Sequence, residues 1–90
     1  MTTEPTRDEM RRACYRYYGV TVSQTLNDAN AAMGLLQAAS AKFQHRIEIG
    51  ISGSGRSSAR MLCVTRWHGG ITLDEAALRC AYYAIPEDER

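Results

Sequence analysis

The sequence predicts one small α+β domain in which two N-terminal helices, a β-hairpin and a C-terminal helix follow one another (ααββα). Three observations predict this fold. The chain of 90 residues is long enough to bury one modest core and too short for two domains. Apolar residues recur at helical spacing before residue 44 and after residue 71. Between these segments they alternate with polar residues, as in a strand. Residues 1–90 are therefore treated as a single domain, with residues 1–5 expected to fray.

The first helix is expected to begin at Thr6 and to be closed by Gly19, which can adopt the positive φ angle common at helix C-termini. Acidic residues come early in this segment and arginines later, the order that the helix dipole favours. Its apolar face repeats at i, i+3, i+4 and i+7, at Met10, Ala13, Cys14 and Tyr17. A short extended link is expected at residues 20–22.

A second, longer helix is expected to start between residues 23 and 27 and to end near Phe43. This helix is predicted to be the central packing element. Its apolar positions are Leu26, Ala29, Met33, Leu36 and Phe43, and the face is widened by Ala32, Leu35 and Ala39. Gly34 in mid-helix costs about 1 kcal/mol relative to alanine, which predicts the close approach of another backbone.

A β-hairpin is expected next, because residues 46–52 alternate between apolar and polar side chains with three isoleucines turned inward. The sequence SGSGRSS then forms a flexible tip, and residues 59–67 form a return strand with both faces covered, which ends at His68-Gly69-Gly70. A two-stranded hairpin is marginal in water. Either the helices cover it, or a second copy in a homodimer or a strand-adding partner extends it.

The last helix is expected to begin at Thr72, where threonine followed three residues later by Glu75 forms a capping box. Pro86 and the charged residues after it end the helix. Its inward stripe consists of Leu73, Ala76, Ala77, Cys80 and Ala84.

Composition and charge exclude several classes of protein. Eleven basic and ten acidic residues give a net charge of +1, too balanced for a nucleic-acid coat or a nucleic-acid mimic. The charges are unevenly distributed, since residues 42–68 are basic and residues 69–90 are acidic, which favours oriented docking. No apolar stretch is long enough to span a membrane, and no secretory signal opens the chain, so a cytoplasmic location is expected.

No residue pattern indicates a reaction. The three cysteines are widely spaced and odd in number, so they are expected to be small buried hydrophobes rather than a disulfide scaffold. With His45 and His68 they form no short-spaced pair typical of zinc sites. We therefore expect no enzyme, no catalytic residue, no metal and no cofactor. The Gly/Ser-rich loop around Arg56 leaves open an anion site, although a mobile hairpin tip uses the same residues.

Arginine and tyrosine indicate two partner-binding surfaces, because these residues are enriched at protein interfaces and also stack on bases. The first surface lies on the first helix and comprises Arg11, Arg12, Tyr15, Arg16 and Tyr18. The second surrounds the hairpin and comprises Arg46, Arg56, Arg60 and Arg66.

Two segments resemble known families. YYGVTVSQTLNDA (residues 17–29) resembles the turn and second helix of a helix-turn-helix, which implies contacts to DNA from Gln24, Thr25, Asn27 and Asn30, with Arg11 and Arg12 behind them. GGITLDEAALRCAYYAI is similar to the end of HicB-type antitoxin domains through Gly70, Thr72, Glu75 and Ala76.

Taken whole, this short, arginine-rich chain resembles small phage or mobile-element accessory proteins of the anti-CRISPR inhibitor type. The resemblance implies a non-enzymatic intracellular protein that binds a host protein or a nucleoprotein complex through its arginine and tyrosine residues. The alternative is a small nucleic-acid-binding transcriptional regulator with a helix-turn-helix-like segment. No membrane partner is expected in either case.

Overall fold

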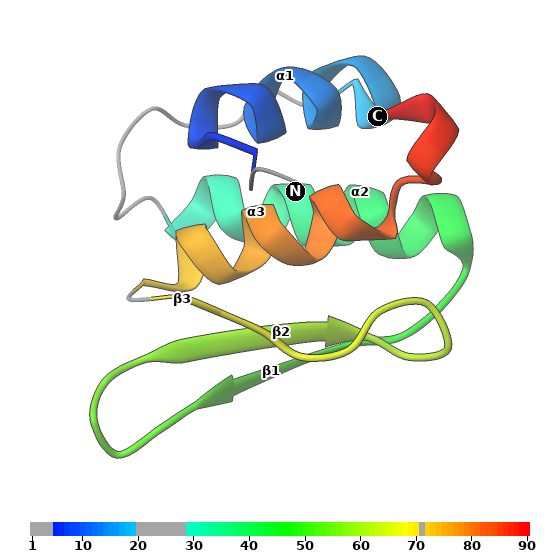
Figure 1. The fold of residues 1–90 in the computed structure, drawn as a ribbon. Coiled ribbons are helices and arrows are strands. Elements are labelled where there is room, and N and C mark those ends of the chain that lie inside the picture. Colours follow the sequence, from blue (N-terminus) through cyan, green and yellow to red (C-terminus); the bar gives the residue numbers. More distant parts are fainter. Residues whose placement is uncertain (1–4, 20–28, 71) are drawn as a thin grey trace.

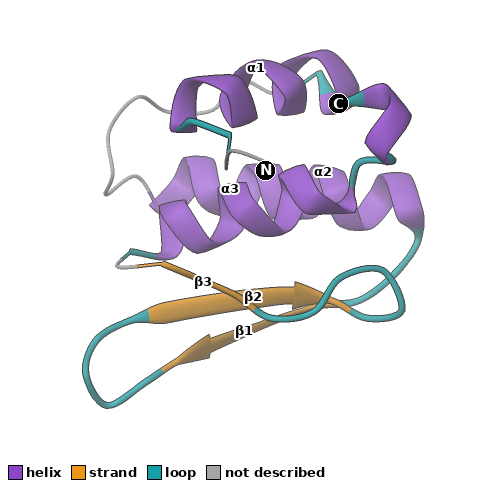
Figure 2. Ribbon diagram, in the orientation of Figure 1, coloured by secondary structure: helices purple, strands orange, loops and turns teal. Residues whose placement is uncertain are grey.

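The computed structural model describes residues 5–19, 29–70 and 72–90, and its elements form three layers (Figure 1). An antiparallel sheet forms one layer, α2 and α3 lie side by side on it, and α1 lies on the far side of these helices (Figure 2). The predicted α+β class and the order helix, helix, hairpin, helix are confirmed. The elements are α1 (Arg7–Tyr18), α2 (Ala29–Phe43), β1 (Ile47–Ile51), β2 (Ser57–Met61), β3 (His68–Gly70), α3 (Leu73–Ala84) and the 3₁₀ helix η1 (Glu87–Glu89).

Local signals determine both ends of α1. The Thr6 side chain accepts a hydrogen bond from the Glu9 backbone N–H at 3.2 Å. Gly19 adopts φ 72° and donates its backbone N–H to the Tyr15 carbonyl at 2.9 Å. Because a left-handed residue is costly for any side chain with a Cβ, glycine suits this position. The predicted buried face is confirmed at Met10, Ala13 and Cys14.

The centre of the domain is α3 and not, as the sequence predicts, the second helix. It packs against α1, α2, β2 and β3. The Thr72 hydroxyl accepts a hydrogen bond from the Glu75 backbone N–H at 3.3 Å, which confirms the predicted cap. Buried positions surround the helix, and four of them are alanine, which lets the sheet and the other helices approach closely. Its buried residues are Asp74, Ala76, Ala77, Leu78, Cys80, Ala81 and Ala84.

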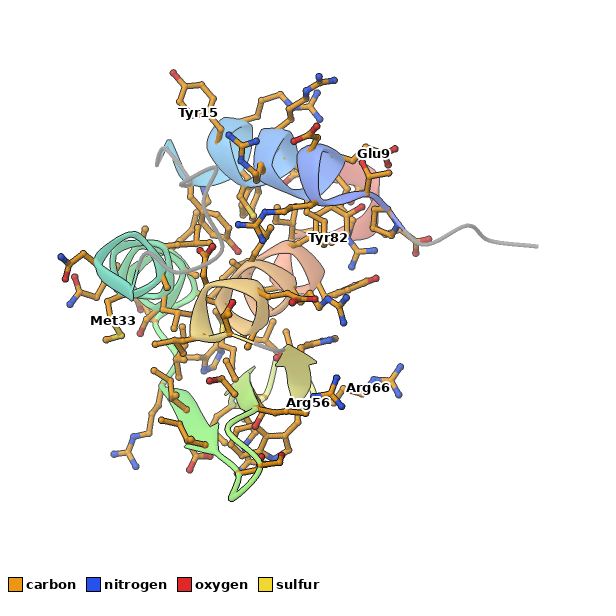
Figure 3. All side chains as sticks on the ribbon, turned by 90° about the vertical axis from the view of Figure 1, so that its left-hand side faces the viewer. Glu9, Tyr15, Met33, Arg56, Arg66 and Tyr82 are labelled. Carbon is orange, nitrogen blue, oxygen red and sulfur yellow. The ribbon has the colours of Figure 1, made fainter. Side chains whose placement is uncertain are left out.

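Only one side of α2 faces the core. Ala32, Leu35, Leu36 and Ala39 are buried as expected. Met33, predicted to point inward, is 40% exposed and projects from α2 on the side of the sheet (Figure 3). Among the described residues outside its own stretch of α2, no atom lies within 4 Å of the point where a Cβ at Gly34 would be, so the predicted close approach of another backbone is wrong for this part of the chain. Both differences arise because α2 packs mainly against α3, whereas α3 also packs against β2 and β3.

Within the described residues the sheet has three strands in the order β1-β2-β3, where the sequence predicts two. β2 ends at Met61, whose backbone N–H donates to the Thr65 hydroxyl at 2.9 Å in a tight turn. The chain then returns as β3, with Ser57 opposite Gly70 and Ala59 opposite His68. The prediction that residues 68–70 merely end a strand is therefore wrong.

One face of the sheet packs on α3, but the edge strand β1 is only partly covered by this helix. Ser57, Ala59 and Met61 of β2 are buried on the α3 side. The register places the isoleucines of β1 on the same face, yet Ile49 and Ile51 are exposed, contrary to the prediction. The prediction that both faces of the return strand are covered is also wrong, since Cys63 and Val64 lie in an exposed turn. Cys14 and Cys80 are buried as expected.

Candidate functional site

The outward side of α1 carries an exposed tyrosine between two arginines. Tyr15 is 58% exposed and projects away from the rest of the domain (Figure 3). Arg12 and Arg16 are also exposed, and neither forms an ion pair or hydrogen bond with any residue that the structure describes. We call Arg12, Tyr15 and Arg16 the α1 surface. Because α1 forms an outer layer, its outward side is accessible.

The two other residues predicted for this surface have contacts within the domain. The Arg11 Nη1 donates to the Asp8 carboxylate at 2.9 Å, so Arg11 carries a compensated charge. The Tyr18 hydroxyl donates to the Ala81 carbonyl of α3 at 2.7 Å, and its ring packs edge-on against Phe43. Burial raises the pKa of Tyr18. Tyr18 therefore joins α1 to α3.

The four hairpin arginines do not form one surface. Arg56 lies at the tip between β1 and β2, whereas Arg66 precedes β3 at the opposite end of β2. Arg46 adjoins β1, at the other edge of the sheet. Arg60 is held by the domain itself, because its Nε donates to the Glu48 carboxylate at 2.8 Å and its guanidinium lies 4.8 Å from the Trp67 ring centroid.

An open hollow of about 400 Å³ lies where the hairpin tip meets α3. It is lined by Ser52, Arg56, Ser57, Ser58, Gly69, Gly70 and Arg79. Hydroxyl groups and arginine suit an anion. The Arg79 guanidinium is already paired with the Glu75 carboxylate at 3.0 Å and donates to the Gly69 carbonyl, so among the lining residues Arg56 alone carries an uncompensated charge.

Packing determines the surroundings of two thiols and of the half-buried His68. Burial raises the pKa of Cys14 to about 12, and burial also raises the pKa of Cys80, so both thiols are protonated at neutral pH. His68 stacks on Tyr83 with ring centroids 4.8 Å apart. Burial lowers the pKa of His68, and the charges of Arg66 and Arg79 lower it further. In the described ranges, no group of three or more His, Cys, Asp and Glu residues could hold a metal ion.

Sequence reasoning missed Trp67, which lies on the face of the sheet opposite α3. Its ring atoms are 3.7 and 3.8 Å from the point where a Cβ at Gly50 would be. Trp67 and the Arg60–Glu48 pair thus form one cluster on this face. A glycine within a strand often indicates close approach of another group, so Gly50 is the signal that could have found it.

The remaining sequence-based candidates do not add a site. Most of the helix-turn-helix-like segment, residues 20–28, lies outside the described residues. Within the described part of the chain, no helix is long and apolar enough to cross a membrane. No family model, curated protein or solved structure matches the chain.

Proposed function

We propose that this chain is a non-enzymatic interaction protein that binds a protein or nucleoprotein partner through the α1 surface. The observation that carries the proposal is Tyr15, 58% exposed between Arg12 and Arg16, neither of which has an ionic partner among the described residues. Tyrosine and arginine are over-represented among the residues that dominate binding energy at interfaces. A rigid helix that presents both types is suited to this use.

The charge of the α1 surface indicates the kind of partner. Arg12 and Arg16 carry two positive charges, whereas the nearby Arg11 is paired with Asp8. Complementary charge speeds association and determines orientation, so the partner is expected to present acidic groups around an apolar contact for the Tyr15 ring. The resemblance to anti-CRISPR-type inhibitors implies that such binding is stoichiometric and that the target is a host protein or a nucleoprotein complex.

The nucleic-acid alternative has less support. Affinity for nucleic acid comes largely from several cations along one phosphate backbone. Arg56 and Arg66 lie at opposite ends of β2, and the α1 surface lies on the far side of the helix layer from the sheet (Figure 1). These positive charges do not follow one continuous path.

A charge-reversal experiment tests the proposal. The tagged protein is used to capture partners from bacterial lysate, with and without nuclease, as wild type and as the double variant Arg12→Glu/Arg16→Glu. The matched control is Arg56→Glu/Arg66→Glu, which makes the same change of charge at two other exposed arginines. We expect a stoichiometric protein that survives nuclease, is lost with the α1 variant and is kept with the control.

Other outcomes contradict the proposal in different ways. Equal capture by both double variants would remove the α1 surface from consideration, provided that circular dichroism shows both to be folded. Nucleic acid as the sole captured component, lost after nuclease treatment, would favour the transcriptional regulator instead. The steep dependence of its affinity on salt would then confirm binding through phosphates.

A further inference from the structure

The strand β1 lies at the edge of the sheet, and one of its sides pairs with no strand that the structure describes. Only β2 pairs with it among the described residues. Two hydrogen bonds flank this pairing, from the Ser52 N–H to the Arg56 carbonyl and from the Leu62 N–H to the Arg46 carbonyl. Backbone groups alternate in direction along an antiparallel strand, so those of Glu48 and Gly50 point toward β2. The N–H and C=O groups of Ile47, Ile49 and Ile51 therefore point outward.

This edge lacks the features that usually prevent strand addition. Exposed edge strands commonly carry lysine, proline, a bulge or an inward-pointing charge. The sequence of β1 is IEIGI, and its one charge, Glu48, is paired with Arg60. Ile49 is 40% and Ile51 is 75% exposed, on the face that α3 covers farther in. Met33 of α2 is also exposed and projects toward the side of the domain where the sheet lies (Figure 3). Unpaired backbone and exposed apolar side chains thus occur together.

We propose that β1 pairs with β1 of a second copy of this chain, antiparallel and with the two-fold axis at Ile49, so that the two sheets form one. The pattern of β1 is symmetric about Ile49, with isoleucine on both sides at alternate positions. Ile49 then lies opposite Ile49 of the second copy, and Ile47 lies opposite Ile51. Each chain contributes three outward N–H groups, and each of these groups meets an outward carbonyl. All the isoleucines remain on the α3 side of the joined sheet.

Charge and register both select this arrangement. A shift of one residue in the register between the two β1 strands would turn the isoleucines of one copy away from the α3 side of the joined sheet. A shift by two toward the N-terminus would place Glu48 opposite Glu48 of the second copy, and like charges directly opposite are destabilising. A shift by two in the other direction would leave Ile47 unpaired. With the axis at Ile49, Glu48 lies opposite Gly50, and its charge is balanced by Arg60 of its own chain.

The dimer does not depend on the proposed function. The α1 surface lies on the far side of the helix layer from the sheet, so it stays accessible in both copies (Figure 1). A dimer joined through β1 would therefore present two α1 surfaces. Failure of dimerisation leaves the capture experiment unaffected, and failure of capture leaves the oligomeric state unaffected.

The first test is the mass of the protein in solution, measured by light scattering after gel filtration over a wide range of concentration. Wild type is expected at twice the chain mass of 10.0 kDa, and Ile51→Lys at the chain mass. Because Ile51 is mostly exposed, this change does not disturb the core. The matched control Val64→Lys alters another partly exposed aliphatic residue outside β1 and is expected to remain a dimer.

The second test is amide hydrogen exchange in the wild-type protein, which does not depend on how well a variant folds. The N–H groups of Ile47, Ile49 and Ile51 are expected to exchange slowly, like those of Glu48 and Gly50. A monomer at every concentration, with fast exchange at Ile49, overturns the proposal. So does a dimer in which Ile51→Lys changes nothing, or an Ile49 amide that is protected only when a foreign peptide or protein is added.

Discussion

Replacing Gly70 with alanine should destabilise the domain through a contact that the sequence does not reveal. Gly70 is buried in β3, next to the first turn of α3. A Cβ at this position would lie 2.8 Å from the Ala76 backbone nitrogen and 2.8 Å from the Glu75 Cβ. Ordinary contacts between heavy atoms are about 3.5–4.0 Å. Neither neighbour can rotate away, because one is helix backbone and the other is the first atom of a side chain, so α3 must move away from the sheet.

The size of the effect follows from the position of α3 at the centre of the domain. Overpacking typically costs about 1–3 kcal/mol, and we expect about 2.5 kcal/mol because the Ala76 N–H also donates to the Thr72 carbonyl at 3.1 Å in the first turn of this helix. In a domain of this size each kcal/mol changes the melting temperature by about 4–8 °C, so Gly70→Ala should lower it by about 10–20 °C.

Thermal unfolding followed by far-UV circular dichroism measures this change. The matched control is Gly69→Ala in the same strand, where a Cβ would meet the Ser57 carbonyl oxygen at 3.8 Å and no other described atom beyond its chain neighbours within 4 Å. An alanine in ordinary contact should change the free energy of unfolding by less than about 0.5 kcal/mol. Equal melting temperatures for the two variants would refute the argument that the sheet and α3 are in such close contact at Gly70.

Two further predictions concern charge. The Arg7 Nη2 donates to the Asp74 carboxylate at 2.6 Å, and Asp74 is only 2% exposed. Removing one partner of a buried ion pair lowers the free energy of unfolding by about 3–5 kcal/mol. The Arg7 side chain is 26% exposed, so we expect a smaller loss, about 2–3 kcal/mol, for Arg7→Met, measured by urea unfolding. Asp8→Asn, which breaks an exposed pair, should cost less than about 1 kcal/mol, and equal costs would contradict this reasoning. The second prediction is a pH dependence at His68. Its pKa in the folded chain lies below the ordinary value of about 6.5, so the unfolded chain binds more protons and stability falls as the pH drops below about 6.5. Urea unfolding should therefore show a larger loss of stability between neutral and mildly acidic pH in wild type than in His68→Phe, which keeps a ring for Tyr83; identical losses would count against it.

The sequence by itself determined the features that depend on neighbours a few residues away. The Thr6 and Thr72 caps, the Gly19 terminus and the buried stripe at Met10 are local, because a helix brings residues three and four apart onto one face. The α+β class follows from the same periodicities. The exposed arginines and tyrosine of the α1 surface could be predicted in the same way, since they lie on the polar side of an amphipathic helix.

Only the tertiary structure decided which apolar surface is covered. Ile49 and Ile51 have the alternation of a buried strand, but α3 lies over β2 and β3, so the edge strand stays open. β3 is three residues long with two glycines, too short to show a strand pattern, and it forms because β2 offers it a partner. Tyr18 is adjacent to the polar side of α1, yet the carbonyl that its hydroxyl meets is 63 residues away in the chain. Each of these outcomes depends on where distant elements pack, and a local pattern cannot encode that.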